Sequence, residues 1–261
     1  MKKKNSLEQI LTAHNYLDKS ISVYRCGRIF EYDIQNAGFT ILKNTDILPV
    51  SDITYIETLS KKDRNIYIGR KSKEYPEIFP VILNKLTEIR KEFALQNSLV
   101  ADDILSIKKD AFFLFKQCNN LSVFDDLYHF TERNVFSSYL YVDEKEFYYD
   151  VAQDRLVVKN LSHQNLHSEI LGFIKKLIRL REKTEDKKKI FDLLKKFKIE
   201  YLSGRLDVEY YRELNNIGKF KIELPDTASY YIDWADTSLK PFISHQYNYA
   251  NVILPIITIL L

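Results

Sequence analysis

The stretch from Asp102 to Phe115 constrains the fold more than any other part of the chain. It contains two short apolar runs, Ile104–Ile107 and Phe112–Phe115, separated only by the four residues Lys108–Ala111. Two such runs of β-branched and aromatic residues predict two strands joined by a tight turn, because both favour a pleated, half-buried surface. The turn contains one acid, Asp110, so the hairpin holds a single carboxylate at a fixed point.

A second acid lies on a predicted strand upstream. Arg28–Ile34 predicts a strand that carries Asp33, and Gln35–Leu42 predicts the start of a helix. The whole of Ser20–Asp33 predicts two strands around Cys26 and Gly27, a hairpin that ends at Asp33. Aspartates on adjacent strands suit metal-dependent phosphoryl transfer, because Mg²⁺ takes one or two protein carboxylates and leaves its other positions for water and phosphate. An Asp in a turn is also a common turn former.

The order of these two motifs resembles the palm of the family B DNA polymerases. In that family the first motif is a strand-end Asp followed by Ser-Leu-Tyr-Pro, and the last is a hairpin with Asp-Thr-Asp-Ser. Here Asp33-Ile-Gln-Asn-Ala-Gly38 stands where the first motif would be, and Lys108-Lys-Asp-Ala111 where the last would be. The resemblance implies that Asp33 and Asp110 are catalytic and bind the metal. It also implies Mg²⁺ or Mn²⁺ as the cofactor and nucleic acid as a partner.

The chain departs from the family pattern at three places. Lys108 replaces the first Asp of the hairpin, Gly38 stands where a sugar-gating Tyr would be, and no segment matches the fingers helix Lys-x-x-x-Asn-Ser-x-Tyr-Gly. An alternative therefore stays open: a catalytically inactive palm-like protein that binds nucleic acid or a replication or transcription partner. A two-metal nuclease is a third possibility, because paired carboxylates do not distinguish bond making from bond breaking.

Residues 44–75 stand where the fingers of a polymerase would be. Ile53, Ile56 and Leu59 suggest one helix, and Ser60–Lys73 is a polar segment with six lysines or arginines. On the polymerase-like interpretation this is a reduced, fingers-like insertion that holds phosphates. A solvated surface loop would have the same composition. The candidate phosphate-binding residues here are Lys61, Lys62, Arg64 and Arg70. The apolar spacing of Pro76–Gln96 predicts one amphipathic helix that leads into the hairpin of Asp110, as in a palm.

The second half of the chain is strand-rich and then helical. Val158-Lys-Asn-Leu161 resembles the Lys-Gly-Leu sequence that tracks the primer backbone in the family, so Lys159 is a candidate contact to nucleic acid. Residues 171–220 hold 14 lysines or arginines against 8 acids, a net charge of +6, while the whole chain carries +3. Such an asymmetry is typical of a nucleic-acid-binding face, although solvated helices also have it. The candidate residues in this region are Lys187, Lys188 and Lys189.

We therefore predict an α+β protein. Residues 1–165 form an antiparallel, palm-like sheet with packed helices, and residues 166–261 form a mainly helical, thumb-like region. Two cysteines without a disulfide framework favour a reducing cytoplasm. The run Val252–Leu261 is too short to span a bilayer and predicts a buried terminal element, so no membrane is expected. A compact chain with polymerase-like motifs suggests a bacteriophage protein that acts in the host cytoplasm. A protein partner is expected to supply the missing polymerase parts.

Overall fold

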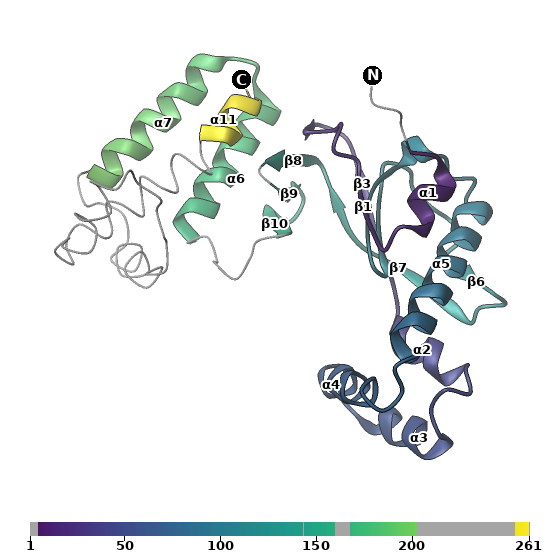
Figure 1. The fold of residues 1–261 in the computed structure, drawn as a ribbon. Helices are drawn as coiled ribbons and strands as arrows, with labels where there is room; N and C mark the ends of the chain where they lie inside the picture. The colour runs from purple at the N-terminus through teal and green to yellow at the C-terminus, as the bar shows by residue number, and fades with distance from the viewer. Residues whose placement is uncertain (1–4, 143, 160–167, 203–253, 261) are drawn as a thin grey trace, which may run out of the picture. The chain divides into compact units, whose positions relative to one another are not determined.

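The computed structural model describes residues 5–142, 144–159, 168–202 and 254–260 (Figure 1). It is an α+β protein, as predicted, and its strands form two antiparallel sheets. Contacts divide the chain into two units, the first formed by residues 1–20 and 28–135 and the second by residues 21–27 and 136–261. This division falls after Val135, whereas the sequence patterns favoured a boundary after residue 165. Each unit has its own sheet and its own core.

The first unit is built on a six-stranded sheet with the strand order β1-β4-β5-β3-β7-β6. The predicted hairpin is present, as β4 and β5 with the pair Lys108 and Ala111 next to the turn. The predicted strand of Asp33 is β3, which lies between β5 and β7. The elements of this unit are α1 (Leu7–Thr12), β1 (Asn15–Leu17), β3 (Ile29–Ile34), α2 (Ala37–Lys43), α3 (Val50–Thr58), α4 (Lys61–Lys71), α5 (Ile78–Gln96), η1 (Ala101–Asp103), β4 (Ile104–Lys108), β5 (Ala111–Leu114), β6 (Ser122–Val123) and β7 (Tyr128–Phe136).

The long helix α5 covers one face of this sheet, as the apolar spacing predicted. Phe93 of α5 is fully buried at the centre of an aromatic cluster, with ring centroids 5.9 Å from Tyr32, 5.5 Å from Phe112 and 4.0 Å from Phe130. Because side chains alternate along a strand, Tyr32 on this face of β3 directs its neighbour Asp33 to the other face. The packing of α5 therefore fixes the side of the sheet on which the first candidate acid lies.

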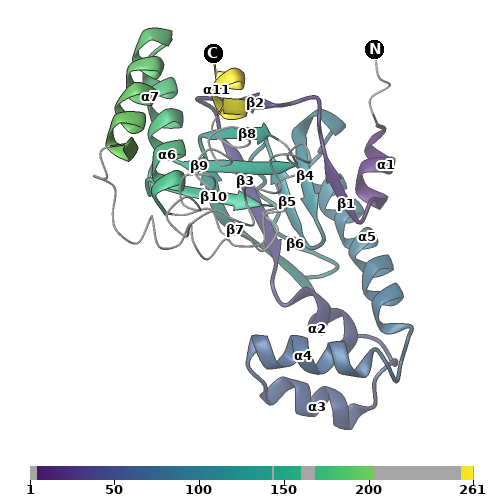
Figure 2. The same ribbon diagram turned by 60° about the vertical axis from the view of Figure 1, so that its left-hand side comes forward.

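Helices α2, α3 and α4 lie together beyond one end of α5, in the part of the chain where fingers were expected (Figures 1 and 2). The polar segment after Ser60 is a helix, which its composition alone did not predict. Ser60 caps α4 by accepting a hydrogen bond from the backbone N–H of Asp63, 3.2 Å away. Lys71 of α4 pairs with Asp52 of α3 at 3.1 Å and with Glu74 at 2.9 Å. A cap, these ion pairs and a small apolar cluster that includes Ile68 therefore stabilise a helix with few apolar residues.

The predicted hairpin between Ser20 and Asp33 was wrong. The strand β2 (Val23–Tyr24) pairs with β8 in the sheet of the second unit, whereas β3 belongs to the sheet of the first. The backbone N–H of Gly27 donates to the carbonyl of Ser137 at 3.1 Å, which fixes the chain after β2 to the second unit. The segment at Cys26 and Gly27, which the sequence predicted to be a hairpin turn, therefore connects a strand of one sheet to a strand of the other.

The second unit packs helices on a four-stranded sheet with the order β10-β9-β8-β2. Its core includes Phe173 and Phe197, whose stacked rings lie 4.2 Å apart. The described part of the terminal run, residues 254–260, is helical. Its residues Ile256, Ile257 and Leu260 are buried, which confirms the predicted buried element. The remaining elements are β8 (Ser138–Val142), β9 (Lys145–Asp150), β10 (Arg155–Lys159), α6 (Ser168–Lys183), α7 (Lys187–Leu202) and α11 (Leu254–Leu260).

No described helix combines the length and the apolar composition needed to cross a bilayer.

Candidate functional site

The structure brings the two candidate acids, Asp33 and Asp110, together at one end of the first sheet. Asp33 lies on β3 directly opposite Ala111 of β5, and Ala111 follows Asp110 in the chain. The next residue on β3, Ile34, donates its backbone N–H to the carbonyl of Asp110 at 3.2 Å. The two acids are therefore fixed by backbone pairing between neighbouring strands, which is more rigid than a loop.

The turn that carries Asp110 contains only two residues. Lys108 and Ala111 form the last pair of the hairpin, so Lys109 and Asp110 make the turn itself. Lys109 has a φ of 53°, the left-handed conformation that tight hairpin turns require at a central position. Asp110 therefore stands at the tip of a short hairpin whose arms are buried.

Several neighbouring charges act on the pKa of Asp33. Burial raises the pKa of Asp33, and the negative charge of Asp110 raises it further, while Arg133 and Lys61 lower it. Arg133 of β7 places its Nη2 atom 2.7 Å from Oδ2 of Asp33, and the side chain of Asp33 is only 20% exposed. Lys61, predicted to bind phosphate, therefore acts electrostatically on the first carboxylate.

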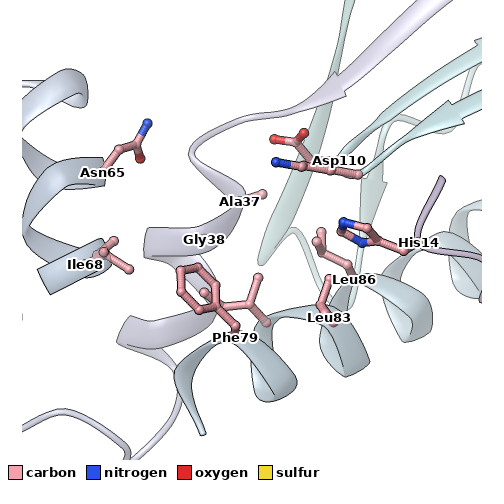
Figure 3. A pocket seen from close by; sticks show the side chains of 12 residues that line it. His14, Ala37, Gly38, Asn65, Ile68, Phe79, Leu83, Leu86 and Asp110 are labelled. Atoms are coloured by element: carbon pink, nitrogen blue, oxygen red, sulfur yellow. The ribbon is translucent and has the colours of Figure 1, made fainter. Parts of the chain in front are cut away.

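A pocket of about 530 Å³ lies beside Asp110 (Figure 3). Its volume is within the range of small-molecule sites. Its walls come from α2, α4, α5 and the hairpin turn, and apolar side chains of α5 form much of the lining. Asp110 and His14 approach it from the side opposite α4. The lining residues are His14, Ala37, Gly38, Asn65, Ile68, Gly69, Phe79, Ile82, Leu83, Leu86, Lys109 and Asp110.

The pocket wall at Gly38 is open. A Cβ atom added at Gly38 would meet only Cδ1 of Ile82, at an ordinary contact distance of 3.8 Å. The neighbouring Phe39 does not line the pocket, because it packs under Arg64, whose Cζ lies 4.5 Å from the ring centroid. Arg64 also donates from Nη2 to the carbonyl of Leu59 at 3.3 Å. In this structure Arg64 therefore packs within the helical insertion, while Lys62 and Arg70 are exposed.

The donor set suits a metal shared with a phosphate ligand. In the described part of the chain, no three or more His, Cys, Asp or Glu side chains gather closely enough to hold a metal by themselves. Asp33 and Asp110 supply carboxylate oxygens, the ligands that Mg²⁺ and Mn²⁺ prefer, and Mg²⁺ commonly uses one or two of them with phosphate and water. Two carboxylates would therefore hold such a cation only together with oxygens from a phosphate or from water.

The comparison with protein families gives a match that covers nearly the whole chain. The model of the family described as Bacteriophage PBS1 gene 130 protein matches residues 6–261. The chain belongs to this bacteriophage family. The match spans both units, so the carboxylate pair and the basic helices are parts of one gene 130 family sequence. No curated protein matches the chain.

This gene 130 family member carries its other candidate cations in the second unit. Lys159 is half-buried on β10, and Lys187, Lys188 and Lys189 are exposed at the start of α7. Three cations in the first turn oppose the helix macrodipole, at a cost of about 0.3–1 kcal/mol each. Asp186 offsets part of this cost by accepting the backbone N–H of Lys188 at 2.9 Å. Of the basic region 171–220, residues beyond 202 lie outside the described part.

Three residues around the candidate site were not predicted from the sequence: Arg133, Arg90 and His14. Arg133 could not be predicted because its ion pair with Asp33 joins two strands that are distant in the sequence. Arg90 lies four residues after Leu86, on the apolar stripe of α5. A charged residue on a stripe that is otherwise apolar could have indicated a buried arginine. His14 follows α1, whose pattern did not indicate that the chain turns toward the pocket.

Proposed function

We propose that this phage protein is a nucleotidyltransferase that acts on nucleic acid, with Asp33 and Asp110 as its metal-binding, catalytic carboxylates. The observation that supports the proposal best is the strand register that brings these acids to the same end of the sheet, where Asp110 also lines a pocket. The resemblance to the family B polymerase palm, from Gly27 to Leu161, agrees with that register. Membership of a bacteriophage family is compatible with the host cytoplasm as the compartment. The proposal also includes a protein partner that completes the reduced fingers.

In this proposal each part of the site has a separate task. Mg²⁺ or Mn²⁺ would polarise the 3′-hydroxyl of a primer and offset the charge of a nucleoside triphosphate, whose α-phosphate is attacked with release of pyrophosphate. The carboxylate oxygens of Asp33 and Asp110 would position the cation. Lys61 offsets phosphate charge, with Lys62 and Arg70 further along α4. The apolar pocket accepts the base and sugar.

Primer extension tests the proposal. A labelled primer on a longer template is incubated with the wild type, Mg²⁺ or Mn²⁺, and ribo- or deoxynucleoside triphosphates. Lengthening of the primer supports a nucleotidyltransferase, shortening supports a nuclease, and tight binding without either supports a catalytically inactive binding protein.

One observation favours the inactive binding protein as the second candidate. Asp33 is already paired with Arg133, and Lys108 and Lys109 directly precede Asp110 in the chain. Positive side chains at the carboxylates reduce the electrostatic need for a cation. Such a protein would use the basic surfaces to bind nucleic acid or a replication or transcription partner.

Sugar selection follows from the open wall at Gly38. We expect the wild type to discriminate between ribo- and deoxynucleotides by less than about tenfold, because no side chain at this position meets the 2′-hydroxyl. Gly38→Tyr should raise the discrimination against ribonucleotides more than about tenfold, whereas Gly38→Ala should change it little. Competitive incorporation measures the ratio. Strong rejection of ribonucleotides by the wild type, retained in Phe39→Ala, would show that Gly38 is not the sugar position.

The lysines at the start of α7 are expected to bind phosphates. Replacing Lys187, Lys188 and Lys189 together by Gln should weaken binding to all nucleic-acid sequences alike. It should also flatten the slope of log affinity against log salt by about one unit for each phosphate that the variant no longer neutralises. Removing these charges from a helix N-terminus should slightly raise the melting temperature. Fluorescence titrations at several salt concentrations measure the slope.

A matched control removes three lysines that already have acidic partners. These ion pairs neutralise the lysine charge locally, so their loss should leave the salt slope nearly unchanged. An equal effect from both triple variants would contradict a specific role for the start of α7. The control lysines, each paired with a carboxylate, are Lys43 with Glu57, Lys85 with Glu88 and Lys91 with Glu8.

A further inference from the structure

Arg133 holds the carboxylate that the proposed metal would need. Its Nη2 atom lies 2.7 Å from Oδ2 of Asp33, a charge-assisted hydrogen-bond distance. The Arg133 side chain is 45% exposed, whereas the Asp33 side chain is 20% exposed. Arg133 is therefore the more exposed member of the ion pair, and Asp33 the more buried one.

The charges around Asp33 explain why the positively charged Arg133 lies beside it. Asp110 and Glu31 both repel the negative charge of Asp33, and Arg133 and Lys61 attract it. Without a metal, two neighbouring carboxylates need positive charge nearby to remain ionised together. A divalent cation would supply that charge at the same place. Once it binds, the charge of Arg133 is surplus and repels the metal.

We infer that Arg133 is a displaceable counter-ion that occupies Asp33 until a divalent cation arrives with a phosphate ligand, and that the released guanidinium then binds the phosphate. The inference rests on the proposed function, since it concerns the same carboxylates. Arginine suits the second task because its planar fork of donors matches phosphate oxygens. Arg133 would therefore oppose binding of the metal alone and favour binding of the metal with phosphate, so that the site fills only when substrate is present.

The test uses the full chain with Arg133→Gln and a matched control, Arg28→Gln. Arg28 is exposed and precedes β3, about 16 Å along the strand from Asp33. Paramagnetic resonance titration with Mn²⁺ alone should show a dissociation constant about tenfold lower in Arg133→Gln than in the wild type. Arg28→Gln should match the wild type within about twofold, because charges this far apart are screened.

In a second titration, Arg133→Gln is expected to bind its ligand more weakly than the wild type, the opposite of the effect on Mn²⁺ alone. With inorganic tripolyphosphate at saturating Mn²⁺, calorimetry should show binding about tenfold weaker in Arg133→Gln than in the wild type, because the variant cannot donate a charged hydrogen bond to the phosphate. A residue that only supports the fold would not change the two affinities in opposite directions.

The outcomes separate this inference from the proposed function. If the wild type and Arg133→Gln bind Mn²⁺ equally, the inference is overturned while metal binding by the carboxylates stands. If the affinities change as expected but the wild type never extends a primer, the counter-ion role stands and the nucleotidyltransferase proposal fails. Absence of Mn²⁺ binding by every variant, with and without tripolyphosphate, overturns both.

Discussion

Replacing Arg90 by Ala is expected to destabilise the protein by about 3–5 kcal/mol, the largest effect of any single substitution that we predict. Arg90 is only 2% exposed, and its Nη1 atom donates to the carbonyl of Leu11 at 3.1 Å and to that of Ala13 at 2.6 Å. Burial lowers its pKa, and the negative charge of Asp110 opposes that shift. Removing the side chain leaves a cavity and two carbonyls without their donor.

Urea unfolding followed by circular dichroism measures this effect. The control is Lys91→Ala, the next residue of α5, whose ion pair with Glu8 is exposed and should contribute less than about 1 kcal/mol. Arg90→Lys retains a charge and should lie between the wild type and Arg90→Ala. An Arg90→Ala protein within about 1 kcal/mol of the wild type would contradict a structural role for the buried guanidinium. Because Ala13 precedes His14, loss of Arg90 should also disturb the pocket.

Asp33→Asn and Asp110→Asn are each expected to lower nucleotide incorporation by at least about a thousandfold. Each substitution keeps the size of the side chain and removes the charge that would hold the cation. Affinity for nucleic acid should stay the same or rise slightly, because a negative charge is removed beside the phosphates. Single-turnover extension and binding titrations, run on the same preparations, separate the two effects.

The matched control for these variants is Asp125→Asn. Asp125 is exposed and has a φ of 50°, a left-handed conformation that Asn adopts as readily as Asp. It lies between β6 and β7 and does not line the pocket. Incorporation should be unchanged in this variant. A thousandfold loss in Asp125→Asn, or normal activity in Asp33→Asn, would show that the charge at Asp33 is not what incorporation requires.

Local patterns in the sequence predicted the part of the fold that carries the site. The hairpin of Asp110 and the helix α5 followed from apolar spacing, because each is a contiguous element with one buried face. The strand β3 was predicted for the same reason, and its alternation put Asp33 on a defined face. The adjacency of Asp33 and Asp110 needed the additional assumption, taken from the polymerase resemblance, that the two strands are neighbours.

What the sequence did not predict depends on contacts between distant segments. The ladder between β2 and β8 joins residues more than a hundred positions apart, and it overrode the local turn signal at Cys26. Arg133 finds Asp33 only because β3 and β7 are neighbours in the sheet. The helix α4 has few apolar residues, so its stability comes from a cap and from ion pairs of Lys71 that periodicity does not detect.

A crystal of the wild type soaked in Mn²⁺ and a non-hydrolysable nucleoside triphosphate tests the central claim, shared metal binding by Asp33 and Asp110, most directly. Anomalous scattering locates Mn²⁺ independently of the protein atoms. We predict a peak within about 2.5 Å of a carboxylate oxygen of Asp33 and of Asp110, with the guanidinium of Arg133 moved onto a phosphate. A bound triphosphate without such a peak, with Arg133 still paired to Asp33, would contradict shared metal binding.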